Sequence, residues 1–388
     1  MAHTAGAVAR DCGCRPQRAH GMICRGATAP ENRVSRWPLF VPLLAAAFVL
    51  VALQLPSHTL VACVCFAALI GAVVAAVHHA EVIAHRVGEP FGTLALALAV
   101  TVIESSLIVM LMIGGGAANA ALPRDTMYAT VMIIANGVVG TSVLLGALRH
   151  REQSFRIEGA GPATAALATL ATLVLVMPTF TVGGGPGGYT VPQLAFVAVS
   201  SLVMWCVFVF FQTVRHRDYF LPATSSADES AHAVPPTDRE AWASAGLLLL
   251  SMIGVVGLAK VLSPAIENVV RATGAPPTVV GIAIALLVLM PESLAAIRAA
   301  LADRLQTSLN LALGSALASI GLTIPVVVVV CIVFDLPLVL GLDAKDTALL
   351  ALTFLVCTIG VGSGRTNMMQ GVVQLVIFAA FLFLAVVP

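Results

Sequence analysis

The sequence carries little charge for its length. Asp, Glu, Lys and Arg make up 10% of the 388 residues, and hydrophobic residues make up 59%, whereas soluble globular domains carry about 25% charged residues. Side chains of this composition cannot cover a water-facing surface, so lipid must cover part of the chain. The formal net charge is only +1, which excludes the strongly basic surface typical of nucleic-acid-binding proteins.

The sequence also lacks the motifs of membrane-embedded enzymes. It contains neither the His-Glu-x-x-His pattern of zinc hydrolases nor the Gly-x-Ser-x-Gly turn of serine hydrolases, and no histidine lies in the middle of an apolar run. We therefore expect no enzymatic activity and no cofactor. An intramembrane hydrolase that uses a pair of glutamates is the remote alternative.

Cysteines show no metal-binding pattern. Five of the eight lie in apolar runs, where a thiol behaves as a small hydrophobe: Cys63, Cys65, Cys206, Cys331 and Cys357. Cys12, Cys14 and Cys24 lie near His20 in an arginine-rich tail at 1–38. Their spacing fits no standard zinc finger, so we expect a disordered basic cytoplasmic tail rather than a zinc site.

Long apolar runs dominate the rest of the chain. Because a helix needs about 20 apolar residues to cross a bilayer, the runs predict an all-α, polytopic membrane protein of about eleven helices. They lie near 39–55, 59–79, 91–113, 126–148, 162–182, 190–213, 242–262, 279–299, 307–333, 346–362 and 368–387. The first of these helices and its loop occupy 39–58.

Five predicted helices lie on each side of a polar linker at 214–241. An odd number of helices makes the second half (242–388) enter the membrane from the side opposite to the first (59–213). The sequence therefore predicts two inverted five-helix repeats, a common plan in secondary transporters.

Basic residues favour the cytoplasmic side of a membrane. With a cytoplasmic amino terminus, all Lys and Arg fall on the cytoplasmic side except Arg124, Lys260, Arg271 and Lys345. We therefore expect a multi-pass protein of the cytoplasmic (inner) membrane in this orientation. The sequence indicates no oligomeric state.

Two of the nineteen acidic residues, Glu104 and Glu292, lie near the middle of apolar runs. An ionisable group at the bilayer centre costs at least about 2.5–3.5 kcal/mol by insertion scales. No Lys or Arg lies equally deep in the sequence, so we expect these two carboxyl groups to hold a proton, a metal ion, or both in turn.

Polar residues recur around the two glutamates. A serine follows each glutamate (Ser105 and Ser293), and Thr101 precedes the first by one helical turn. In the next helix of each half, an asparagine is followed four residues later by a glycine and a hydroxyl residue: Asn136 with Gly140 and Thr141, and Asn310 with Gly314 and Ser315. We expect both glutamates and both asparagines to meet at one midplane site.

These groups suit exchange of Ca²⁺ for protons. Ca²⁺ takes six to eight oxygen ligands, which two carboxylates, amides and hydroxyls can supply. Pro291, directly before Glu292, is expected to break its helix and free backbone carbonyls for the ion. Carboxyl groups withdrawn from water also hold protons readily. The competing interpretation is that single polar residues bond helices together and that Gly140 and Gly314 only allow close packing.

A second cluster, His78, His79, Glu81 and His85, ends the 59–79 run. It suits either a cytoplasmic pH or metal sensor, since histidine titrates near neutral pH, or a polar cap at the interface. In the 214–241 linker, Asp228, Glu229, Asp238 and Glu240 allow a Ca²⁺-collecting loop, although a solvated linker is the simpler interpretation.

Two stretches resemble the calcium:cation antiporter superfamily, specifically its bacterial calcium (sodium/potassium)/proton antiporter branch. One reads AEVIAHRVGEPFGTL at 80–94 and continues to TVIE at 101–104; the other reads LMPESLAA at 289–296 and LQTSLNLALGSALA at 305–318. The resemblance covers about 75–387. It implies that the two stretches are the superfamily's alpha repeats, that Glu104 and Glu292 bind the cation, and that Asn136 and Asn310 match its second-helix asparagines.

The match departs from the superfamily pattern in places. Ile103, not proline, precedes Glu104, and the second-helix Gly-Ser-Asn pattern becomes Gly-Thr-Ser at 140–142 and Gly-Ser-Ala at 314–316. Fewer amide oxygens would surround the ion, which leaves Na⁺ or K⁺ open beside Ca²⁺. We expect the protein to interact with inorganic cations, protons and the bilayer, and to act in cation homeostasis. A passive channel is the remaining alternative. A single acid pair in an inverted repeat favours an antiporter over a channel.

Overall fold

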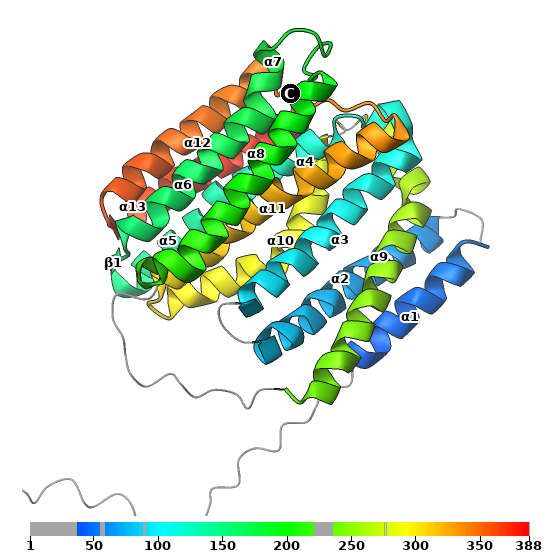
Figure 1. Ribbon diagram of the computed structural model, residues 1–388, viewed down its shortest axis with the longest axis horizontal. Coiled ribbons are helices and arrows are strands. Elements are labelled where there is room, and N and C mark those ends of the chain that lie inside the picture. The colour runs from blue at the N-terminus through cyan, green and yellow to red at the C-terminus, as the bar shows by residue number, and fades with distance from the viewer. Residues whose placement is uncertain are drawn as a thin grey trace, which may run out of the picture. The chain divides into compact units, whose positions relative to one another are not determined.

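The structure is a computed structural model, and it describes residues 37–54, 59–87, 91–220, 236–274, 276 and 278–387. The predicted tail up to residue 36 and the linker from 221 to 235 lie outside the described residues. The described chain is almost entirely helical (Figure 1), as the apolar runs predict.

The first half contains α1 (Trp37–Ala52), α2 (Thr59–Val87), α3 (Phe91–Gly115), η1 (Gly116–Asn119), α4 (Leu122–Met132), η2 (Ile133–Val138), α5 (Val139–His150), β1 (Gln153–Ser154), α6 (Ile157–Ala171), η3 (Thr172–Val176), α7 (Met177–Phe180), α8 (Val191–Phe210), η4 (Phe211–Arg215) and η5 (Arg217–Phe220). The second half contains α9 (Asp238–Thr273), α10 (Thr278–Leu301), α11 (Leu305–Phe334), α12 (Ala344–Gly362), β2 (Arg365–Thr366) and α13 (Met368–Val386). The segments η2, η3 and η4 are π-helical turns inside or at the end of longer helices.

Ten helices of the described chain are long and apolar enough to cross a membrane. α1, with 16 residues, is shorter than the usual span. α9 is longer than its apolar run predicts: it starts at a capping box formed by Thr237 and Glu240 and continues past Pro264 to Gly274, whose left-handed backbone ends it. The apolar run marks the part in lipid, whereas the caps mark where the helix begins and ends.

The helices pack in two groups around separate apolar cores. α1, α2, α3 and α9 share one core, which includes Val73, Leu107 and Leu258. The larger core surrounds α11, which contacts α3, α6, α8 and α10 and contributes Ile320 and Ile324, both fully buried. α11 therefore forms the centre of the helical body (Figure 1).

Contacts between the two halves come in matched pairs. α4 packs on α10 while α3 packs on α11, and α5 packs on α13 while α8 packs on α11. The first residues of α10 and α4 meet, because a Cβ on Gly281 would lie 2.9 Å from the Asp125 backbone. α4 starts close after the end of α3, so α10 begins at the end of the molecule where α3 finishes. The equivalent helices α3 and α10 thus run in opposite directions, as an inverted repeat requires.

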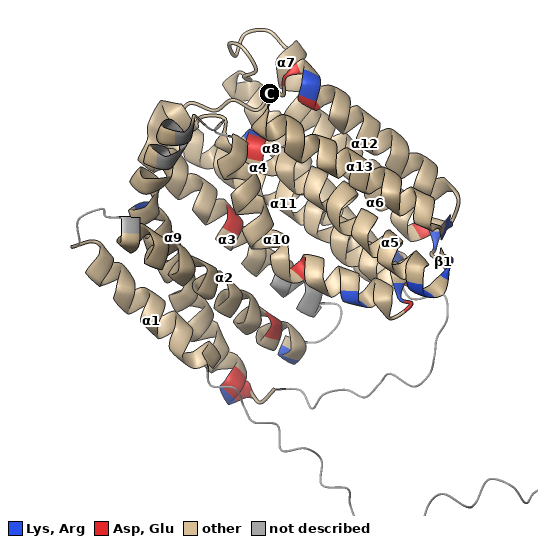
Figure 2. Cartoon of the chain, turned by 180° about the vertical axis from the view of Figure 1, so that it is seen from behind, with Lys and Arg blue, Asp and Glu red and all other residues tan. Residues whose placement is uncertain are grey.

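The opposite end of the molecule, where α2, α5 and α10 finish, carries most of the arginines of the described residues; Figure 2 shows a group of basic residues around β1. Here β1 pairs with β2 in a two-stranded antiparallel sheet that joins the α5–α6 turn to the α12–α13 turn. Gln153 in β1 also donates to the carbonyl of Ala300, at 2.9 Å. Turns of both halves are therefore bonded together at this arginine-rich end.

The expected helix break at Pro291 is absent, because α10 continues through it from Thr278 to Leu301. A proline removes one helical N–H donor, and a membrane helix packed against neighbours tolerates that loss. Gly140 lies at a close crossing of α5 and α13, where a Cβ would come within 3.3 Å of the Gly371 carbonyl. A Cβ on Gly314 would meet no atom within 4 Å, so close packing does not account for that glycine.

The α5–α13 crossing gives a test of the packing. A Cβ on Gly371 would lie 2.6 Å from the Leu144 amide nitrogen and 2.9 Å from the Gly140 carbonyl oxygen. We expect Gly371→Ala to lower the free energy of unfolding by about 1–3 kcal/mol, because backbone atoms must move apart. The measurement is the melting temperature in detergent. Gly246→Ala in α9, where a Cβ meets nothing within 4 Å, is the matched control. Equal melting temperatures of the two variants would contradict the close approach of α5 and α13 at Gly371.

Candidate ion-binding site

Glu104 is the most deeply buried acidic side chain of the described chain, with none of its surface exposed. It lies in the middle of α3, where its neighbours Ile103 and Leu107 are also buried. Its carboxyl group faces the hydroxyl groups of Thr130 on α4 and of Ser319 and Thr323 on α11. Three helices from the two halves therefore bring one carboxyl and three hydroxyl groups together.

These oxygen atoms are not paired among themselves at hydrogen-bonding geometry. Both carboxyl oxygens of Glu104 and the hydroxyls of Thr130 and Thr323 are buried without a hydrogen-bond partner in the described chain. Buried polar atoms are normally satisfied, because an unpaired one costs about 1–3 kcal/mol. Such a set of hard oxygen donors around a carboxylate suits a proton or a hard cation such as Ca²⁺ or Na⁺.

Glu292 lies on α10 and is half-buried, although its Oε2 atom is buried without a partner. Its carboxyl group lies within electrostatic range of both Glu104 and Glu81. α2, α3 and α10 each carry a red acidic band in the part of the bundle where these helices run (Figure 2). Two like charges in a site withdrawn from water repel strongly, so protonation or cation binding at one glutamate affects the other.

The hydroxyls next to the glutamates bond back to their own helices. Thr101 donates to the Ala97 carbonyl at 2.8 Å, Ser105 to the Thr101 carbonyl at 2.7 Å, and Ser293 to the Leu289 carbonyl at 2.6 Å. A hydroxyl that donates in this way keeps lone pairs for another partner. Thr141 and Ser315 are half-buried on α5 and α11.

Asn136 lies in the π-helical segment η2 and is fully buried. Its Nδ2 donates to the Thr353 hydroxyl on α12 at 2.9 Å, while its Oδ1 has no hydrogen-bond partner among the described residues. π-Helical turns often occur at functional sites. Here the turn directs the amide nitrogen towards α12.

Asn310 lies near the arginine-rich end of α11, nine residues before Ser319, which faces Glu104. Its Nδ2 donates to the Phe220 carbonyl at 2.6 Å, and its Oδ1 accepts from Gln306 at 2.9 Å. The expected meeting of two glutamates and two asparagines at one site is therefore not seen. Each asparagine lies four residues before a glycine, but this shared spacing does not determine how far along its helix the asparagine lies. Asn310 lies in the second turn of α11, whereas Asn136 lies in the middle of the rod formed by α4, η2 and α5.

The residues of the histidine cluster contact different parts of the chain. His79 is buried and its Nε2 lies 2.9 Å from the Pro38 carbonyl oxygen, and the His78 ring packs on Trp37 at 5.6 Å between centroids. Glu81 is exposed instead and interacts with His85 and Glu292. In the part of the chain that the structure describes, no three His, Cys, Asp or Glu side chains are placed to hold a metal.

Thr130, Ser319 and Thr323 are site residues that sequence reasoning missed. Ser319 and Thr323 are four residues apart and so share one face of α11. This spacing was the signal that the sequence offered. Hydroxyl residues are common in membrane helices and usually bond to their own backbone, and nothing in the sequence showed that this face meets Glu104.

The model of the sodium/calcium exchanger protein family matches residues 57–214 and 243–387, on the two sides of the linker. The chain is 45% identical to the putative ionic transporter y4hA of Sinorhizobium fredii, over 92% of this chain and 97% of that protein. It is 35% identical to the sodium-potassium/proton antiporter ChaA of Escherichia coli, over 91% of this chain and 97% of that one. A Ca²⁺/H⁺ antiporter of Aphanothece halophytica is 27% identical, over 65% of this chain and 71% of that protein.

Solved structures share the fold. The structure of native YfkE superposes with a TM-score of 0.66 at 17% identity, covering 90% of this chain and 100% of that one. The H⁺/Ca²⁺ exchanger CAX gives 0.63 at 13% identity, covering 89% and 88%. The family model matches on both sides of the linker, and the S. fredii and E. coli relatives align along nearly the whole chain, so the protein belongs to the sodium/calcium exchanger family, within the calcium:cation antiporter superfamily.

Proposed function

We propose that this protein is a secondary antiporter that exchanges Ca²⁺ for H⁺ across the cytoplasmic membrane, using Glu104 and Glu292. The observation that carries the proposal is the surroundings of Glu104: a fully buried carboxyl group with unpartnered oxygens, faced by three hydroxyls and coupled electrostatically to a second glutamate. The antiporter names of the E. coli and A. halophytica relatives support it.

The exchange follows from charge balance. Two carboxylates neutralise one Ca²⁺, and two protons neutralise the same pair, so the site has the same charge in both loaded states. An unloaded pair would leave two unbalanced negative charges in a region of low dielectric, which is costly. Movement of the site between the two membrane faces is thus favoured only when it is loaded, and each cycle exchanges one cation for two protons.

The two glutamates differ in access. Glu292 is half-buried and lies within electrostatic range of the exposed Glu81, whereas Glu104 is fully buried. A cation that arrives in this conformation meets Glu292 first and completes its shell at Glu104 and its hydroxyls. With the amino terminus in the cytoplasm, the arginine-rich end towards which α10 runs faces the cytoplasm, as basic residues favour.

Exchange of Na⁺ or K⁺ for H⁺ at the same site is the second candidate. The 35% identical E. coli relative is named a sodium-potassium/proton antiporter and aligns along 91% of this chain. The groups that face Glu104 in the described chain are hydroxyls, and such oxygens suit a monovalent ion with one carboxylate as well as a divalent ion with two.

The acid pair is tested by transport in inside-out vesicles with an imposed pH gradient. We expect addition of Ca²⁺ to release protons with the wild type, and Glu104→Gln and Glu292→Gln to abolish that release, because a neutral amide cannot exchange a proton. Na⁺ and K⁺, added separately, identify the ion. The exposed Glu158→Gln is the matched control for removing one negative charge. Wild-type exchange by either of the first two variants, inserted normally, would refute the mechanism.

The hydroxyl groups on α11 are tested by apparent cation affinity. We expect Ser319→Ala and Thr323→Val each to raise the half-saturating cation concentration about tenfold, which corresponds to about 1.4 kcal/mol, because each removes an oxygen near Glu104. Ser251→Ala is the matched control: this serine on α9 is also buried but bonds to the Leu247 carbonyl. Unchanged affinity in both α11 variants would remove these hydroxyls from the site.

Substitution of Asn310 distinguishes a structural role of this residue from an ion-binding role. Asn310→Leu leaves the Phe220 carbonyl without its side-chain donor, so we expect a loss of about 1–3 kcal/mol of stability with little change in cation affinity. The measurements are the melting temperature and the half-saturating cation concentration of the same preparation. A tenfold loss of affinity without a fall in melting temperature would place Asn310 at the ion after all.

A further inference from the structure

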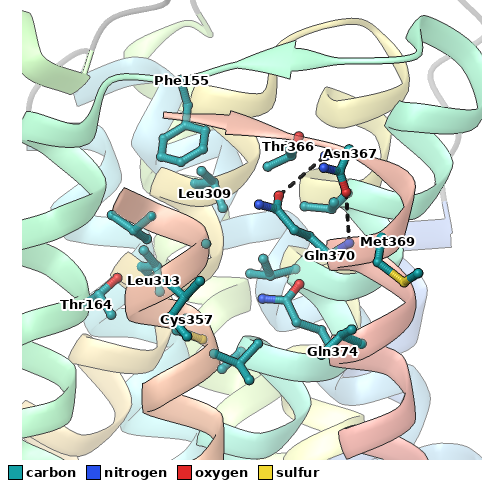
Figure 3. Close-up of a pocket in the computed structure, with 18 residues that line it drawn as sticks. Phe155, Thr164, Leu309, Leu313, Cys357, Thr366, Asn367, Met369, Gln370 and Gln374 are labelled. Atoms are coloured by element: carbon teal, nitrogen blue, oxygen red, sulfur yellow. Dashed lines mark hydrogen bonds between the residues drawn. The ribbon is translucent and has the colours of Figure 1, made fainter. Parts of the chain in front are cut away.

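A pocket of about 340 Å³ lies between α5, α6, α11, α12 and α13 (Figure 3). Its volume falls in the range of small-molecule sites, roughly 300–1,000 Å³. Neither glutamate lines it, nor do the hydroxyl residues that face Glu104. It is therefore separate from the proposed ion site.

The pocket walls are mostly apolar, and one buried amide oxygen among them has no hydrogen-bond partner in the described chain. Its apolar lining includes Val139 and Val143 on α5, Leu309 and Leu313 on α11, and Phe155. Among them lies the Gln374 amide, which points towards the side that carries Leu313 and Cys357 (Figure 3). Gln374 is only 8% exposed, and its Oε1 has no hydrogen-bond partner in the described chain. A few polar groups in an apolar pocket usually orient a ligand.

The polar residues at the arginine-rich end of the pocket are already paired. Asn367 and Gln370 satisfy each other in the capping box that starts α13. Gln374 Oε1 is therefore the buried polar atom of the pocket lining that a ligand would satisfy.

The pocket is bordered by side chains that face outward from the helical body. Ile359 on α12 and Met369 on α13 both line it and are 66% and 68% exposed. In a chain whose exposed helix faces are covered by lipid, these residues place the entrance between α12 and α13 next to the bilayer. A molecule that enters here must dissolve in the membrane, because a charged one pays a high desolvation cost.

We propose that this pocket binds a neutral, lipid-soluble molecule that has an apolar body and one hydroxyl group, and that the hydroxyl pairs with the Gln374 amide. A hydroxyl both donates and accepts a hydrogen bond, so it matches either end of the amide. The molecule enters from the bilayer between α12 and α13 and contacts helices of both halves of the chain. A bound ligand of this kind stabilises the folded state.

Two pocket residues provide direct probes. Cys357 lines the pocket, so occupancy should shield its thiol from reagents. Gly360 also lines it, and a Cβ there meets nothing within 4 Å, so a larger side chain at 360 can fill the pocket without displacing backbone. Gly362 is equally open but does not line the pocket, which makes it the matched control.

The experiment uses the full chain with Cys357 as its single cysteine, in phosphatidylcholine nanodiscs. The rate of labelling by N-cyclohexylmaleimide is measured with 1-decanol, with decane, or with neither, at equal content in the membrane. We expect decanol to slow labelling about tenfold and decane much less. Gly360→Phe should abolish the protection, Gly362→Phe should keep it, and Gln374→Leu should remove the difference between decanol and decane. Melting temperatures show that each variant is folded.

Three results would overturn the proposal. Equal protection by decane and decanol in the wild type would show that the amide is not used and that any acyl chain fills the space. Protection that survives Gly360→Phe would place the alcohol elsewhere. An unchanged preference for decanol in Gln374→Leu would assign the hydrogen bond to another group. A decanol-induced rise in melting temperature, lost in Gly360→Phe, is the independent readout that supports it.

Discussion

The structure depends on the cost of holding carboxyl groups away from water inside a membrane. Glu104 has no exposed surface and no hydrogen-bonded partner for either oxygen in the described chain, and Glu292 lies within its electrostatic range. Two charges in such a place are tolerated only if protons or a cation neutralise them. The convergence of α3, α4, α10 and α11 supplies the hydroxyl oxygens around the first carboxyl and keeps the second close to it.

The inverted arrangement explains how this convergence arises. Because α3 and α10 run in opposite directions, each half places its glutamate near the middle of the molecule from the opposite side. The matched contacts, α4 on α10 and α3 on α11, keep each glutamate helix against a helix of the other half. A transporter built this way presents one site to two membrane faces, which is the geometric requirement of alternating access.

The two halves are not equivalent in their polar residues. Ser319 and Thr323 of α11 face Glu104, whereas Asn136 in the other half bonds to Thr353 on α12 and Asn310 bonds to the Phe220 carbonyl. In addition, Gln374 Oε1 has no hydrogen-bond partner among the described residues, in a mostly apolar pocket beside α5. The repeat thus sets the positions of the helices, while the contacts of individual polar side chains differ between the halves.

The sequence by itself determined the helical membrane fold and the two central acids. The fold follows because apolar runs of spanning length must be helical in lipid, where every backbone group needs a partner, and Glu104 and Glu292 stand out because charge is rare in such runs. Helix ends were less predictable: α9 extends beyond its apolar run because Thr237 and Gly274 cap it. Only the tertiary structure decided which hydroxyls face Glu104, that Asn310 lies near the arginine-rich end, and that α10 passes through Pro291 unbroken. Those features depend on which helix faces meet and at what depth, and spacing along one chain does not specify contacts between helices far apart in it.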